Sequence, residues 1–132
     1  MATELKTFPA QPVLVVDDDK ESRFALVVTL QSAGITNLRT VSDSAGLPQM
    51  LANEAFSLLL LDLNMPGLSG HAVLQKTAQL EGRPPMVIVT GSSRPRDLAQ
   101  GSWDGVVDCL VKPVDRDRLV CAVRAALARS RR

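Results

Sequence analysis

Short aliphatic runs alternate with amphipathic stretches along the chain. The runs are typical of buried strands, and the stretches place apolar residues at helical spacing. We predict five strands, at 13–16, around 38–41, and at 56–62, 86–89 and 106–111. We predict helices over 20–32, 45–53, 69–80 and 95–100, and from Asp115 to about 129. Strands that alternate with helices are joined by right-handed crossovers, which predicts a doubly wound α/β fold: a five-stranded parallel sheet with helices on both faces.

Two phenylalanines stand out as large residues for the core. Aromatic residues make up only 3% of the sequence and tyrosine is absent, so the core must be mainly aliphatic. We expect Phe24 and Phe56 to be the large exceptions, with Phe24 on the apolar face of the helix at 20–32. For the helix at 45–53, the residues expected to provide an N-cap are Ser42, Asp43 and Ser44.

An acid ends the most apolar run of the chain. Four leucines precede Asp62, and Pro66 and Gly67 break the chain soon afterwards. This pattern predicts a strand buried on both faces that delivers Asp62 to a loop at its carboxyl end, where parallel sheets bind ligands. The alternative is that Asp62 caps the following helix or turns the chain.

Other predicted strands end in polar residues of a related kind. Asp17 and Asp18 follow the first strand, Thr90 ends the fourth and Lys112 follows the fifth. Three carboxylates in one crevice repel one another unless a cation lies among them, and hard oxygen ligands suit Mg²⁺. A phosphoryl group on one of these acids would meet the metal, a hydroxyl and an ammonium, which is the usual way in which proteins stabilise phosphoryl charge. Asp62 stands alone in the sequence and is therefore the better candidate for the phosphorylated acid.

Four segments together resemble the receiver domain of two-component response regulators, which has a flavodoxin-like fold. Their order and spacing are close to those of the family, and the resemblance extends from Val13 to the last helix. The segments are VLVVDDD at 13–19, LLLDLNMPG at 59–67, VIVTG at 87–91 and LVKP at 110–113.

The resemblance implies a specific role for each of these residues. Asp62 would accept a phosphoryl group from a phosphohistidine of a sensor histidine kinase or a histidine phosphotransfer protein. The implied Mg²⁺ ligands are Asp17, Asp18, Asp62 and Asn64. The implied phosphoryl-binding residues are Thr90, Gly91 and Lys112, with Thr90 also part of the conformational switch. The resemblance further implies that the peptide bond between Lys112 and Pro113 is cis.

Cys109 departs from the family pattern. The family usually carries an aromatic residue three positions before the active-site lysine, and this aromatic moves inward on activation. With Cys109 at the switch position, the alternative function is an interaction module that keeps the receiver fold and does not depend on phosphorylation. A third possibility, a small aspartate-nucleophile phosphatase, would require a second acid two positions after Asp62, where the chain has Asn64.

The remaining composition fits a small signalling domain. The 132 residues are enough for one core, and we assign 1–12 to a flexible lead-in and 13–130 to the domain. A formal charge of +1 argues neither for nor against a nucleic-acid partner. Six arginines lie between Asp115 and Arg132, but the dipole of the last helix and its solvated face explain them, so we expect no direct nucleic-acid binding. The N-terminus has no signal-peptide pattern and no apolar run is long enough to span a membrane. We expect a cytoplasmic location, no enzymatic activity, and a downstream protein partner or an output domain in a larger chain.

Overall fold

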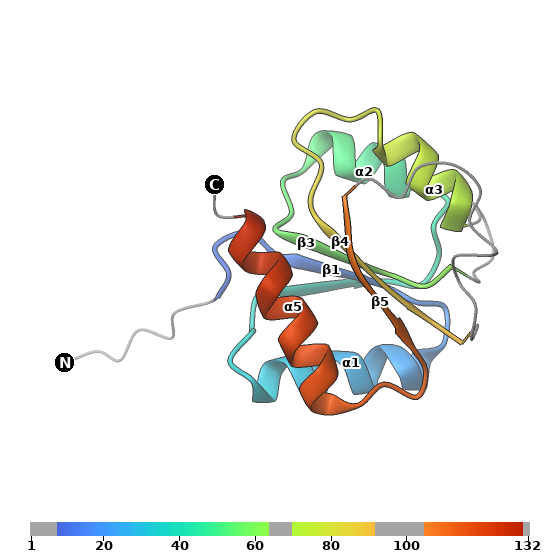
Figure 1. The fold of residues 1–132 in the computed structure, drawn as a ribbon. Helices are drawn as coiled ribbons and strands as arrows, with labels where there is room; N and C mark the ends of the chain where they lie inside the picture. The colour runs from blue at the N-terminus through green and yellow to red at the C-terminus, as the bar shows by residue number, and fades with distance from the viewer. Residues whose placement is uncertain (1–7, 64–69, 92–104, 131–132) are drawn as a thin grey trace.

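The computed structural model describes residues 8–63, 70–91 and 105–130 (Figure 1). The strands are β1 (Val13–Val16), β2 (Leu38–Val41), β3 (Leu58–Leu61), β4 (Met86–Thr90) and β5 (Val106–Val111). The helices are α1 (Lys20–Ser32), α2 (Leu47–Asn53), α3 (Gly70–Thr77) and α5 (Arg116–Ser130). The predicted helix at 95–100 lies outside the described residues.

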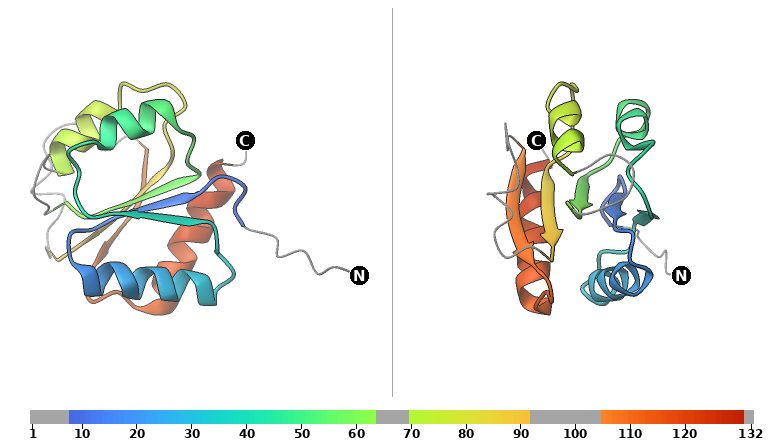
Figure 2. Two further views of the ribbon diagram at one scale, coloured as in Figure 1. Left: turned by 180° about the vertical axis from the view of Figure 1, so that it is seen from behind. Right: turned by 90° about the vertical axis from the view of Figure 1, so that its right-hand side faces the viewer.

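The strands form one parallel sheet in the order β2-β1-β3-β4-β5. Helices α2 and α3 cover one face, and α1 and α5 cover the other (Figures 1 and 2). This arrangement confirms the predicted doubly wound fold. The strand order reverses at β1. The carboxyl ends of the neighbouring interior strands β1 and β3 therefore lie side by side at the end of the sheet where such folds bind ligands.

The two hydrophobic cores alternate along the central strands β1, β3 and β4. Val13 and Val15 face α1 and α5, whereas Leu14 and Val16 face α2 and α3. Successive side chains of a strand point to opposite faces, so a strand covered on both sides is apolar at every position. This alternation explains the four buried leucines of β3.

Helix α1 packs against the sheet differently from the prediction. Leu26 and Leu30 are its buried residues, and the side chain of Phe24 is 69% exposed. Phe24 and Leu26 are separated by about 160° around a helix of 3.6 residues per turn, so they cannot face the same core. The prediction for Phe24 was therefore wrong, whereas the prediction for Phe56, which is 5% exposed, is confirmed.

Helix α2 begins two residues later than predicted. Its N-cap is Gly46, which has no side-chain hydrogen bond to offer. Asp43 instead closes a local turn, since its Oδ1 accepts a hydrogen bond from the backbone N–H of Ala45 at 3.0 Å. The prediction that 42–44 would cap this helix was wrong because the side chain of Asp43 serves that turn.

The last residues of the predicted lead-in are anchored to the domain. The carbonyl of Phe8 accepts hydrogen bonds from the N–H groups of Thr36 at 2.8 Å and Asn37 at 3.0 Å. The side-chain amide of Asn37 donates to the carbonyls of Pro9 and Ala10. Residues 8–10 thus lie against the loop that precedes β2. Within the described residues, no helix combines the length and apolar character that crossing a lipid bilayer requires.

Candidate phosphoacceptor and metal site

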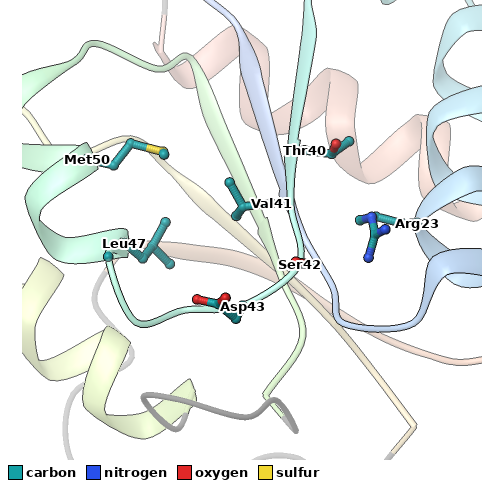
Figure 3. Close-up of a pocket in the computed structure, with 8 residues that line it drawn as sticks. Arg23, Thr40, Val41, Ser42, Asp43, Leu47 and Met50 are labelled. Atoms are coloured by element: carbon teal, nitrogen blue, oxygen red, sulfur yellow. The ribbon is translucent and has the colours of Figure 1, made fainter.

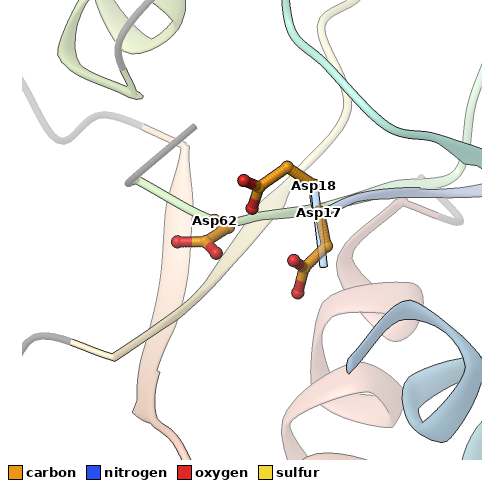
Figure 4. Close-up of side chains that lie close together, drawn as sticks. All are labelled: Asp17, Asp18 and Asp62. Atoms are coloured by element: carbon orange, nitrogen blue, oxygen red, sulfur yellow. The ribbon is translucent and has the colours of Figure 1, made fainter. Parts of the chain in front are cut away.

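Three aspartates meet at the carboxyl ends of the two central strands. Asp17 and Asp18 follow β1, and Asp62 follows β3 (Figure 4). Each offers a carboxylate oxygen, and these oxygens all lie within 4.8 Å of one another. The paired strands are in register at Val16 and Leu61, so the acids that follow them emerge side by side. The structure brings together the three carboxylates that the sequence proposed as a group.

Lys112 connects two of these acids. Its Nζ donates to Oδ2 of Asp17 at 2.7 Å and to Oδ2 of Asp62 at 3.1 Å. Burial alone would lower the pKa of Lys112, but the two carboxylates together hold it above its usual value. The ammonium therefore stays charged and partly offsets the repulsion among the three acids.

Asp17 is the most firmly held member of the cluster. Its side chain is 1% exposed. Its Oδ1 accepts from the N–H of Asp19 at 2.9 Å, and its Oδ2 accepts from the hydroxyl of Ser22 at 2.8 Å. Burial, the largest effect, would raise the pKa of Asp17, but the hydrogen bonds from Lys112, Asp19 and Ser22 lower it overall. Asp17 is consequently ionised and fixed in position.

The donor set fits a hard divalent cation. Carboxylate oxygens at mutual distances below 4.8 Å are suited to Mg²⁺, which binds through a few carboxylates and retains several waters. Asp18 is exposed, and this exposure leaves room on that side of the cluster for a hydrated ion. Asn64, the fourth predicted ligand, lies outside the described residues.

Thr90 and Gly91 lie at the end of β4, next to the acids. Thr90 is fully buried, and its carbonyl accepts a hydrogen bond from the N–H of Lys112 at 2.8 Å. Gly91 is exposed, and no heavy atom lies within 4 Å of the position that a Cβ there would take. The peptide bond between Lys112 and Pro113 is cis, as predicted.

Cys109 lies farther back on β5. It is partly buried and packs against the core on the α2 and α3 side, where it pairs in register with Ile88. The structure therefore places this residue in the sheet and not in the acid cluster.

The sequence reasoning missed two residues that support the cluster. Ser22 hydrogen-bonds the carboxylate of Asp17, and Arg23 donates from its NH1 to the main-chain carbonyl of Asp17 at 2.8 Å. Both lie near the start of α1, five and six residues after Asp17. The helix that follows an acid-bearing strand turns its first residues toward that strand's end, and this geometry could have indicated them.

Comparison with known proteins identifies the family. Residues 13–124 match the family model described as the response regulator receiver domain. The chain belongs to the response regulator receiver family. Receiver domains are signalling modules of two-component systems.

Relatives and solved structures agree with this assignment. The receiver is 35% identical over 117 residues to the C4-dicarboxylate transport transcriptional regulatory protein DctD of Rhizobium meliloti, covering 89% of this chain and 25% of that protein. It is 34% identical over 116 residues to the DNA-binding transcriptional regulator NtrC of Escherichia coli K12, covering 88% and 24%. A response regulator receiver domain from Clostridium thermocellum superposes with a TM-score of 0.77 at 25% identity, covering 92% and 97%. A sensor protein from Polaromonas sp. JS666 has the same fold, with a TM-score of 0.80 at 22% identity, covering 92% and 99%.

The relatives DctD and NtrC are much longer than this receiver. The chain spans about a quarter of the length of DctD and NtrC. The expectation that the chain does not bind nucleic acid directly finds no support among these relatives, because NtrC is itself described as DNA-binding.

Proposed function

We propose that this receiver accepts a phosphoryl group on Asp62 in a Mg²⁺-dependent reaction and signals through a changed affinity for a protein partner. The donor would be a phosphohistidine of a sensor histidine kinase or a histidine phosphotransfer protein. The observation that carries the proposal is the position of Asp62, whose carboxylate lies beside those of Asp17 and Asp18 and 3.1 Å from Nζ of Lys112. An acid, a metal-binding pair and a fixed ammonium are the groups that phosphoryl transfer to a carboxylate requires.

In the proposed reaction, a carboxylate oxygen of Asp62 attacks the phosphorus of the phosphohistidine. The new O–P bond forms as the N–P bond breaks, and the released imidazole nitrogen takes a proton from solvent. Asp17, Asp18, Asp62 and the carbonyl of Asn64 would hold Mg²⁺. When bound, the cation would supply positive charge to the phosphoryl oxygens. Lys112 would leave the carboxylate of Asp62 and pair with a phosphoryl oxygen.

The remaining residues of the site would contact the phosphoryl group and respond to its charge. The hydroxyl of Thr90 and the backbone at Gly91 would contact the phosphoryl oxygens, since both lie at the end of β4. A phosphoryl group adds negative charge and acceptor oxygens, and such a local change has an effect elsewhere only if a two-state element responds to it. We propose that Thr90 and Cys109 belong to that element. The receiver would act in the cytoplasm, as a signalling module and not as an enzyme.

The test is the intact mass of the protein after incubation with Mg²⁺ and acetyl phosphate. The wild type should gain one phosphoryl group, and Asp62→Asn or an excess of EDTA should abolish the gain. Asp117→Asn is the matched control, because the Asp117 side chain is 90% exposed and lies outside the cluster. Phosphorylation of the Asp62→Asn protein would refute the site assignment.

One observation supports the second candidate, an interaction module that does not need phosphorylation. Cys109 occupies the position at which the family usually carries the moving aromatic. A wild-type protein that gains no phosphoryl group, even from candidate kinases, would favour this function.

Lys112→Ala separates the steps of the first candidate, because it should permit phosphorylation and weaken the conformational response.

A further inference from the structure

Arg23 touches the backbone of the acid cluster but contributes no ligand to it. It lies near the start of α1 and is half-buried. Its NH1 donates to the carbonyl of Asp17 at 2.8 Å. We propose that Arg23 is a positioning residue, which fixes the peptide unit joining Asp17 to Asp18 and thereby directs the Asp18 carboxylate toward the cation. The inference rests on the proposed function, since it assumes a divalent cation among the three acids.

The carbonyl of Asp17 lies just beyond the end of β1, where the neighbouring strand β2 offers it no further hydrogen-bond donor within the described residues. The N–H of Asp17 donates to the carbonyl of Val41 at 3.2 Å, which is the last contact between β1 and β2. Beyond it the chain leaves the sheet for the turn into α1. A buried carbonyl needs a hydrogen-bond partner, and Arg23 provides it from the helix that follows.

Asp18 depends on its backbone for its orientation. Asp17 is held through both of its carboxylate oxygens, whereas the carboxylate of Asp18 accepts no hydrogen bond within the described part of the chain. The peptide between them is planar, so a hydrogen bond to its carbonyl limits rotation of the whole plane and sets the direction in which the Asp18 side chain leaves the chain. A charged donor makes this bond stronger than a neutral one.

Arg23 forms no ion pair with any residue that the structure describes. It lines a cleft of about 410 Å³ between α1, the end of β2 and the start of α2 (Figure 3). Asp43 is the acid of that lining, yet it forms no ion pair with Arg23 within the described residues. The hydrogen bond to Asp17 is the one that the Arg23 guanidinium makes in the same part of the chain. A solvated surface ion pair therefore does not account for this arginine.

The affinity for Mn²⁺, measured by the loss of its free-ion paramagnetic resonance signal, tests the proposal without any phosphoryl transfer. Arg23→Ala should bind Mn²⁺ about 10-fold more weakly than the wild type, as expected when the support of a metal ligand is removed. Arg23→Lys, which keeps a charged donor without the planar fork, should be intermediate. Arg39→Ala is the matched control, because Arg39 pairs with Glu54 and lies 5.4 Å over the ring of Phe56, away from the acids.

A second measurement separates positioning from general stability. A purely structural role would lower the melting temperature equally with and without Mg²⁺, whereas a positioning role should reduce the rise in melting temperature that Mg²⁺ produces. If Arg23→Ala does not fold, Arg23→Lys decides, with an Mn²⁺ affinity expected below that of the wild type.

Three results would overturn the proposal. The first is an Mn²⁺ affinity of Arg23→Ala equal to that of the wild type, or of Arg23→Lys if Arg23→Ala does not fold. The second is an Mg²⁺-induced rise in the melting temperature of the variant equal to that of the wild type. The third is a wild-type protein that binds no Mn²⁺. A wild-type protein whose Mn²⁺ affinity depends on Arg23, but which takes no phosphoryl group, would leave this inference standing and refute the proposed phosphorylation alone.

Discussion

Replacing Lys112 by methionine tests how the acid cluster is held together before a cation arrives. Methionine keeps an unbranched apolar side chain of similar length and removes the ammonium. Asp17 and Asp62 then lose their shared partner, and three carboxylates remain close together without the charge of that ammonium. We expect the variant to be less stable than the wild type in metal-free buffer, and to recover more stability than the wild type when Mg²⁺ is added.

The size of the loss follows from the geometry. The two bonds of 2.7 and 3.1 Å join Lys112 to side chains that are 1% and 7% exposed. A hydrogen bond to a charged group contributes about 1.5–3 kcal/mol, so two give about 3–6 kcal/mol. The Lys112 side chain is 24% exposed, and water can replace part of what is lost, so we expect a loss of about 3 kcal/mol. For 132 residues this corresponds to a fall in melting temperature of roughly 10 °C.

Thermal unfolding followed by circular dichroism, with and without Mg²⁺, measures both effects. Added Mg²⁺ stabilises the folded state according to its affinity, and that affinity should rise when the competing ammonium is removed. Lys76→Met is the matched control, since Lys76 is an exposed lysine in the last turn of α3. An unchanged melting temperature in metal-free buffer, or an Mg²⁺ response no larger than that of the wild type, would refute the reasoning.

Two further predictions concern the fold around the site. In urea unfolding, Phe56→Ala should lower the free energy of unfolding by about 3–5 kcal/mol, because it leaves a cavity in the core. Phe24→Ala should lower it by less than about 1 kcal/mol, because the Phe24 side chain is 69% exposed. Equal losses would contradict the packing described for α1. The two hydrogen bonds from Arg118 lower the pKa of Asp108 below its usual 3.8, so the stability that this pair contributes is complete above that pH and is lost as pH falls through the lower folded-state value. Urea unfolding should therefore show a larger gap between wild type and Asp108→Asn at pH 7 than near pH 2, and a gap that does not shrink in acid would show that Asp108 contributes in another way.

The sheet was predictable because strands buried on both faces leave a plain mark in the sequence. The apolar runs gave the positions of all five strands, and four polar strand ends gave the acids, Thr90 and Lys112. The side on which α1 packs was not predictable from spacing alone, because its apolar residues are spread around much of the helix. Phe24 and Leu26 compete for the same core, and only the position of the sheet decides between them.

The support of the acids was harder to predict than the acids themselves. A strand end is marked by a change from apolar to polar residues, but Ser22 and Arg23 lie within a helix where polar residues are ordinary. Their roles depend on how the turn after β1 directs α1 over the strand end. The order of strand, turn and helix brings the first turn of α1 near the strand end, but residue type alone does not single out Ser22 and Arg23 within that turn.

The register of the sheet explains why a lysine, and not a shorter residue, completes the cluster. Leu61 pairs with Ile88, which pairs with Cys109, so Lys112 lies three positions beyond the level of Leu61 and two beyond that of Asp62. Two positions along a strand span about 6.6 Å, a distance that the long lysine side chain can cover by reaching back toward the acids. An even offset also keeps Lys112 on the same face as Asp62, whereas an odd offset would direct it to the opposite face. The same count places Cys109 level with the last leucine of β3, one position behind Asp62, and its packing on the α2 and α3 face is a route by which a residue there can respond to the site.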